Sequence, residues 1–290
     1  MDWSQIKSWP NSNLSRRGHG PVHRWHIQEA GAGKTVLMLH GAGGSTHSYR
    51  GLIPTLAQDF RVIALDLPGH GFTQLGARHR CGLDAMAEDV KKLCDHEGWT
   101  PDAIVGHSAG GAVALRLAES DLSPRGQTPL VIGINAATEQ FKGIAGLLFP
   151  VMAKALAAVP FTASLFSGAS ASPDRIKALI GSTGSVLDAE GLDLYRRLVG
   201  DRNHVDGTLL MMAQWKLNPL LARLPDHPAR VHLLVGDKDT TVPPAVSRNA
   251  AARMRDATVH MLDGLGHLAH EEQPFETARM IRDIIRDALR

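Results

Sequence analysis

The residues with the clearest potential for chemistry form the segment Gly106–Gly110, which reads Gly-His-Ser-Ala-Gly. An apolar run that ends at Val105 precedes this segment, and a run of small residues typical of a helix, Ala109–Leu117, follows it. A serine between a strand and a helix, with a glycine two residues away on each side, is the pattern of a nucleophile elbow. The glycines are needed because side chains there would clash where the helix folds back against the strand. The pattern therefore predicts that Ser108 is a nucleophile.

A nucleophilic serine needs a base and an acid that orients the base. Asp239 follows a predicted strand, and His267 lies in a glycine-flanked loop after the next one. We predict that Ser108, Asp239 and His267 form a catalytic triad in this chain order. Asp237 is the alternative acid, but its position is better suited to the turn itself. His270 is the alternative base, although it stands next to two glutamates at the expected start of a helix.

Acyl chemistry also needs hydrogen-bond donors for the negative oxygen of the intermediate. The glycine-rich segment His40–Gly44 directly follows the apolar run Val36–Leu39. Such a turn allows backbone N–H groups to point into a site. We predict that the N–H groups of Ala42 and Ala109 form the oxyanion hole, Ala109 being the residue after the nucleophile, with Gly43 as a further donor.

Short apolar runs alternate with helical patterns along most of the chain, which is typical of a parallel α/β sheet covered on both faces. Leu83–His96 and Ala109–Glu119 have the spacing of helices, and a last helix begins at Pro274. Seven strands are expected, at Arg24–Gln28, Val36–Leu39, Arg61–Leu65, Ala103–Gly106, Leu130–Ile134, Val231–Val235 and Thr258–Met261.

The alternation fails between Ala136 and Pro225, where the pattern is helical throughout. We therefore expect a core made of residues 1–135 and 225–290, with residues 136–224 inserted as a helical lid over the crevice at the ends of the strands. Helices are expected at Glu139–Val159, Pro173–Ile180, Asp188–Val199 and Val205–Trp215. Candidate walls of an apolar substrate pocket are His107, Leu148, Phe149, Met152, Met212 and Trp215.

One stretch of this insertion, Ile144–Phe166, is nearly all apolar and long enough to span a bilayer. Pro150, Lys154 and Pro160 interrupt it, so we expect buried or lid helices and no transmembrane segment. The N-terminus has no apolar region typical of a secretory signal. These features predict a cytoplasmic protein, with peripheral contact to a membrane left open.

Composition excludes several other classes of protein. Lys and Arg number 31 against 29 Asp and Glu, a balance that argues against a nucleic-acid-binding surface. Two cysteines, Cys81 and Cys94, cannot build a disulfide framework and are expected to be free thiols. Gly31–Thr35 resembles the end of a phosphate loop, but Gln28 stands where the first glycine is required. We find no pattern for a cofactor or a metal, and expect neither.

The motifs taken together resemble the α/β-hydrolase superfamily. The resemblance rests on His40-Gly41, the segment Asp66–Gly71, the elbow Gly106–Gly110, the Asp239 loop and Gly266-His267. It implies a mostly parallel, twisted sheet flanked by helices, with an inserted lid. It also implies that Asp66–Gly71 is a tight loop after a strand, in which His70 is structural. A serine nucleophile excludes relatives that attack with an aspartate.

A narrower resemblance covers almost the whole chain. It points to the magnesium-chelatase accessory proteins of bacteriochlorophyll biosynthesis, and implies a role near magnesium insertion into protoporphyrin IX, with chelatase subunits as partners and an apolar small molecule, such as a tetrapyrrole, as ligand. An esterase-like hydrolase and a non-catalytic binding protein that retains the triad both remain open. The residues that carry this resemblance are Trp9-Pro10, Ser15-Arg16, Trp25–Gln28, Ser45–Arg50, Gly71–Thr73 and Met211–Trp215.

Overall fold

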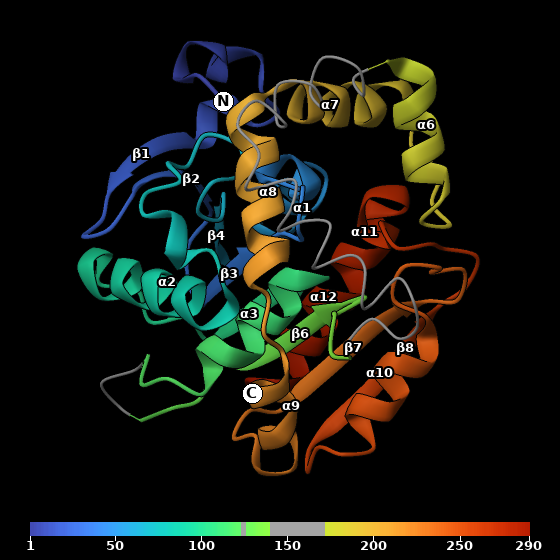
Figure 1. The fold of residues 1–290 in the computed structure, drawn as a ribbon. Helices are drawn as coiled ribbons and strands as arrows, with labels where there is room; N and C mark the ends of the chain where they lie inside the picture. The colour runs from blue at the N-terminus through green and yellow to red at the C-terminus, as the bar shows by residue number, and fades with distance from the viewer. Residues whose placement is uncertain (123–125, 140–171) are drawn as a thin grey trace.

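A computed structural model describes residues 1–122, 126–139 and 172–290 of the chain (Figure 1). Its centre is an eight-stranded sheet in the order β1-β2-β4-β3-β5-β6-β7-β8. All neighbours from β4 to β8 in this order are parallel, whereas β2 is antiparallel to both β1 and β4. The strands are β1 Ser15–His19, β2 Arg24–Ala30, β3 Thr35–Leu39, β4 Arg61–Leu65, β5 Ala103–His107, β6 Leu130–Ile134, β7 Val231–Gly236 and β8 Ala257–Leu262. The predicted mostly parallel sheet is confirmed.

Strand β1 is the one element of the sheet that the sequence pattern does not predict. Its residues read Ser-Arg-Arg-Gly-His, without the alternation of apolar and polar residues that marks a half-buried strand. The strand pairs only with β2, at the edge of the sheet. Charged side chains are common on edge strands because they discourage pairing with other chains. Position at the edge therefore explains both the composition and the missed prediction.

Helices cover both faces of the sheet, because alternate side chains of the buried strands point to opposite faces. Leu37 and Leu39 of β3 belong to one apolar cluster, together with α2 (Leu83–Glu97), α3 (Ala109–Ala118) and α10 (Pro244–Ala251). Val36 and Met38 belong to the other, together with α1 (Leu52–Leu56) and α12 (Pro274–Ala288). Figure 1 shows α2 and α3 in front of the sheet and α12 behind it. Shorter helices are η1 Trp3–Ser8, η2 Ser12–Leu14, η3 Thr46–Tyr49, η4 Arg78–Arg80, η5 Leu224–Asp226 and α11 Ala269–Glu272.

Between β6 and β7 the described residues contain helices and loops but no strand. The helices are α6 Pro173–Gly181, α7 Ala189–Gly200, α8 Arg202–Gln214, α9 Asn218–Arg223 and the short η5. Figure 1 shows α8 in front of the central strands, with α7 and α6 extending from its upper end. Tyr195 of α7 anchors this segment to the rest of the chain, because its hydroxyl donates to the Glu271 carboxylate at 2.7 Å.

Two predictions for this insertion fall on residues that the structure does not describe. The expected helix Glu139–Val159 and the apolar stretch Ile144–Phe166 both lie mostly or wholly within residues 140–171. Within the described ranges, no helix has the length and apolar character needed to cross a bilayer.

Candidate active site

Ser108 sits at a sharp turn between β5 and α3. Its backbone has φ 50° and ψ −117°, a conformation that side-chain-bearing residues rarely adopt and that costs about 1–3 kcal/mol. The flanking glycines make the turn possible: a Cβ on Gly106 would lie 2.3 Å from the Gly110 carbonyl oxygen, and one on Gly110 would lie 2.0 Å from that of Leu39. The local sequence therefore stores strain at the residue that it predicts as the nucleophile.

Asp239 and His267 form a buried pair at the ends of β7 and β8. His267 Nδ1 lies 2.7 Å from Asp239 Oδ2. The other carboxylate oxygen, Oδ1, accepts the backbone N–H groups of Thr241 and Val242, each at 2.8 Å. These three contacts fix the carboxylate, and through it the plane of the imidazole ring. With Nδ1–H donating to Asp239, the lone pair of Nε2 is left to accept a proton.

The alternative acid and base are engaged elsewhere. Asp237 is exposed, and its Oδ1 accepts the N–H of Gly264 at 2.7 Å, so it stabilises the loop after β8 and not, as its position in the sequence predicts, its own turn. His270 is fully buried, and its Nε2 lies 2.8 Å from Ser48 Oγ. Burial lowers the pKa of His270 to about 3, with the charges of His267 and Arg50 acting in the same direction. His270 is thus a neutral ring in the core.

Asn135 holds the His267 loop against the sheet, a role that the sequence analysis does not assign. Its Nδ2 donates to the carbonyl oxygens of Gly266 and His267 at 3.0 and 2.9 Å, and its Oδ1 accepts the Gly236 N–H at 2.8 Å. Asn135 has φ 45°, and asparagine tolerates this left-handed region better than most residues. An asparagine directly after a buried strand is the signal that could have drawn attention to it.

His107, a predicted pocket residue, lies beside the base. Its Nε2 is 3.0 Å from the His267 carbonyl oxygen, and its ring is 4.8 Å from the His267 ring and 4.5 Å from that of His270. Burial lowers the pKa of His107 well below 6.5, and the two neighbouring imidazoles lower it further. The neutral ring donates its Nε2–H to the His267 carbonyl oxygen, so His107 helps to hold the His267 loop in place.

The predicted oxyanion-hole residues lie in a tight turn next to Ser108. Gly44 N–H donates to the Gly41 carbonyl at 3.0 Å, and Gly43 has φ 73°, which favours glycine. A Cβ on Gly41 would lie 3.0 Å from Ser108 Cβ, so the turn touches the nucleophile. Within the described ranges, the N–H groups of Ala42 and Gly43 have no hydrogen-bond acceptor. The N–H of Ala109 is also left free by its helix, because it is the first residue of α3.

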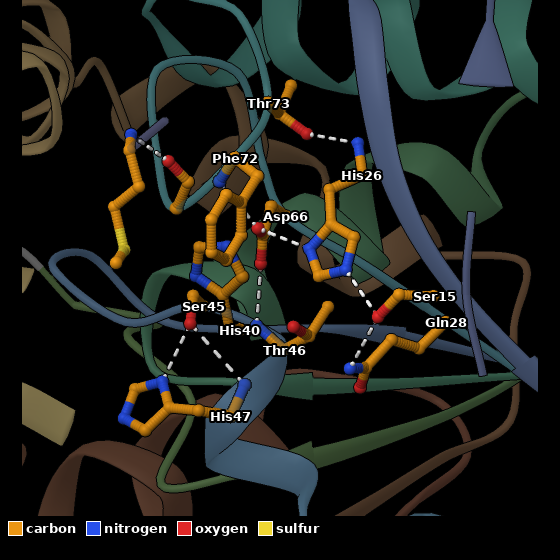
Figure 2. A network of polar contacts seen from close by, with 12 residues as sticks. Ser15, His26, Gln28, His40, Ser45, Thr46, His47, Asp66, Phe72 and Thr73 are labelled. Carbon is orange, nitrogen blue, oxygen red and sulfur yellow. Dashed lines mark hydrogen bonds and ion pairs between the residues drawn. The ribbon is translucent and has the colours of Figure 1, made fainter. Parts of the chain in front are cut away.

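A buried carboxylate, Asp66, ties the start of η3, which follows this turn, to two other segments (Figure 2). Its Oδ1 accepts the Thr46 N–H at 2.7 Å, and its Oδ2 accepts the Phe72 N–H at 2.8 Å and His26 Nδ1–H at 2.6 Å. Figure 2 also shows His26 Nε2 facing Ser15 Oγ, at 3.0 Å. Burial alone would raise the pKa of Asp66, but the charge and hydrogen bond of His26, the charge of His40 and the Phe72 N–H hold it far below its usual range. Asp66 thus acts as a fixed anion.

The remaining predicted pocket residues divide into two groups. Met212 lies in α8 and Trp215 directly after it, and both are half-buried. Trp215 packs against the same apolar cluster as Ala42 of the turn. Leu148, Phe149 and Met152 lie outside the described residues.

The fold and the site define the class of protein. A family model described as the alpha/beta hydrolase fold matches residues 34–274, and the chain belongs to this family. Solved structures agree with this fold: the epoxide hydrolase CorEH superposes with a TM-score of 0.77, covering 95% of this chain and 99% of that one at 22% identity. An esterase from Thermogutta terrifontis has a TM-score of 0.74, covering 94% and 98% at 22% identity.

A relative by sequence is more specific. The magnesium-chelatase 30 kDa subunit of Rhodobacter capsulatus is 48% identical over 278 residues, which cover 95% of this chain and 96% of that protein. The narrower resemblance noted in the sequence is therefore confirmed.

Proposed function

We propose that this protein is a serine hydrolase that cleaves ester or related acyl bonds. The observation that carries the proposal is the buried Asp239–His267 pair, whose His267 carbonyl oxygen lies 3.0 Å from Nε2 of His107, the residue before the strained turn of Ser108. In the reaction, Ser108 Oγ bonds to the substrate carbonyl carbon while its proton passes to His267 Nε2. Asp239 keeps the imidazole oriented and stabilises its charged form. The negative oxygen that develops is stabilised by the N–H groups of Ala42 and Ala109, with Gly43 adjacent.

The second half of the cycle returns the enzyme to its starting state. The intermediate expels the leaving alcohol, which takes the proton from His267, and an acyl group stays on Ser108. A water molecule then gives a proton to His267 and attacks the acyl carbon, releasing the acid and restoring the serine. No metal or cofactor takes part in these steps.

We further propose that the hydrolase serves as an accessory factor for magnesium insertion in bacteriochlorophyll biosynthesis. Support comes from the 48% identity to a protein named as a magnesium-chelatase subunit. In this proposal residues 136–224 form the lid over an apolar ligand, and the partners are a tetrapyrrole and the chelatase subunits. The protein acts in the cytoplasm.

The same relative supports a second candidate function, that of a binding protein which retains the triad without using it. Its name describes a subunit of an assembly, not a hydrolase. Hydrolysis of short activated esters by the wild type and Ser108→Ala separates the two. We expect the alanine variant to lose nearly all turnover and to unfold at nearly the wild-type temperature, because the side-chain hydrogen bonds of the described residues around His267 do not involve Ser108 Oγ. Residual activity above about a tenth of wild type would remove Ser108 as the nucleophile.

A further inference from the structure

A histidine of the inserted helix α8 contacts two loops of the candidate site at once. His204 Nδ1 accepts the Gly71 N–H at 3.0 Å, and His204 Nε2 lies 3.1 Å from the Gly43 carbonyl oxygen. The side chain is 2% exposed. It therefore joins the loop after β4 to the turn that carries the predicted oxyanion-hole donors, across the boundary between the insertion and the core.

The two contacts determine the tautomer of the ring. Because a backbone N–H donates to Nδ1, that nitrogen carries the lone pair, and the proton of the neutral ring is on Nε2. Nε2–H then donates to the Gly43 carbonyl. Burial lowers the pKa of His204 well below 6.5, and the neighbouring His70 and His40 lower it further. Both hydrogen bonds are thus available at neutral pH.

The bond to Gly43 completes the fixation of the turn. The peptide between Gly43 and Gly44 is held on both sides, since its N–H donates to the Gly41 carbonyl and its carbonyl accepts from His204. Gly41 is held as well, because its carbonyl lies 2.8 Å from His40 Nδ1. With these carbonyls engaged, the free N–H groups of Ala42 and Gly43 are the donors that remain beside Ser108.

Close backbone packing keeps α8 in the position that this bond requires. A Cβ on Gly207, one turn after His204, would lie 2.2 Å from the carbonyl oxygen of Gly69. The Asp201 side chain caps the helix by accepting the His204 N–H at 2.9 Å. The helix therefore cannot move closer to the loop that contains Gly69, and its first turn is fixed in the position that lets the His204 imidazole contact Gly43.

We propose that His204 is a positioning residue, through which the inserted helix α8 sets the geometry of the oxyanion hole. The catalytic consequence rests on the proposed hydrolase function. The inserted helices then do more than cover the ligand: loss of the His204–Gly43 bond frees the turn and misplaces the donors that stabilise the transition state.

The kinetic test compares three variants on a short activated ester. We expect His204→Phe to lower kcat about 10- to 100-fold with little change in KM, because misplaced donors weaken the transition state and not substrate binding. His204→Gln should recover most of kcat, since its amide can accept from Gly71 and donate to Gly43. Thr208→Ala is the matched control. Thr208 lies on the same helix as His204 and also faces Gly43, but its hydroxyl donates to the His204 carbonyl oxygen and not to Gly43. The variant should keep kcat.

A second measurement does not depend on activity. In wild-type protein labelled with ¹⁵N-histidine, the ring signals that are absent in His204→Phe belong to His204. Their chemical shifts in the wild type should be those of a neutral ring with its proton on Nε2. A ring protonated on Nδ1, or a charged one at neutral pH, overturns the inference whether or not the protein hydrolyses esters. If the wild type is active, an unchanged kcat in His204→Phe also overturns it, as does an equal loss in Thr208→Ala. If the wild type is inactive but the ring has the expected tautomer, the proposed hydrolase function fails and the structural bond stands.

Discussion

Acidification from pH 7 to pH 5 should remove a large part of the free energy of unfolding, because the candidate site is surrounded by buried, uncharged histidines. His70 and His270 are fully buried, and burial lowers the pKa of each from 6.5 to about 3. In the unfolded chain the same rings take up a proton near pH 6.5. The unfolded state therefore binds more protons between these two values, so the stability present above pH 6.5 is lost progressively as the pH falls toward 3.

The size of the effect follows from the two pKa values. At pH 5, about 1.5 units below the unfolded pKa, each ring costs roughly 2 kcal/mol, so His70 and His270 together cost about 4 kcal/mol. The total stability of a domain is typically ~5–15 kcal/mol. Most carboxylates add little to this loss of stability between pH 7 and pH 5, because they titrate near pH 4 when unfolded. Glu271, whose pKa is raised by burial, gains stability as the pH falls and so acts in the opposite direction. Histidines with pKa values also lowered by burial, and so with the same sign, are His40, His47, His107, His204, His232 and His260.

Urea unfolding followed by tryptophan fluorescence at pH 7, 6 and 5 measures this loss. His70→Asn removes one titrating ring and can still donate to the Pro68 carbonyl, which His70 Nδ1 contacts at 3.1 Å. Between pH 7 and pH 5, the free energy of unfolding of His70→Asn should fall by about 2 kcal/mol less than that of the wild type, whatever the absolute stability of the variant. His96→Asn, at an exposed histidine, should keep the wild-type loss. A wild-type free energy of unfolding that changes by less than about 1 kcal/mol over this range would show that His70 and His270 do not have the lowered pKa values of buried neutral rings.

Two further predictions concern the acid and the ligand. Asp239→Asn should lower kcat about 10,000-fold, by disturbing the tautomer and orientation of His267, while Asp237→Asn should change kcat far less; the reverse ranking in steady-state kinetics would show that the wrong carboxylate was chosen. Protoporphyrin IX or its magnesium form should bind above Ser108 and quench Trp215 fluorescence, with Trp215→Phe separating this signal from the other four tryptophans. A titration to micromolar porphyrin with neither saturable quenching nor a Soret-band shift would exclude this ligand and favour chelatase contact or an unrelated ester.

The sequence predicts those parts of the structure that are determined by residues close to one another in the chain. The apolar runs of β3 to β7 follow from burial on both faces, and the elbow of Ser108 follows from the glycines that it requires. Strand β1 escapes prediction because an edge strand needs no apolar pattern.

Contacts between distant segments could not be predicted in this way. His204 bonds to Gly43, 161 positions earlier, and Asn135 bonds to His267, 132 positions later. No periodicity or spacing connects such pairs, because they meet only after the sheet and the inserted helices have come together. The same reason explains why most of the fifteen histidines looked unremarkable in sequence, although many of them form the buried, neutral surroundings of the site.

Labelling with a fluorophosphonate tests whether Ser108 is an activated nucleophile, because such reagents react readily only with an activated serine. Peptide mass spectrometry of the labelled wild type should find one adduct, on Ser108, which is absent in Ser108→Ala and forms much more slowly in Asp239→Asn. Heat-unfolded protein should not react, because activation depends on the folded Asp239–His267 pair. Native protein that stays unlabelled while a control esterase reacts fully would contradict the claim. So would an adduct on another residue, such as Ser15, whose hydroxyl faces His26 Nε2 at 3.0 Å.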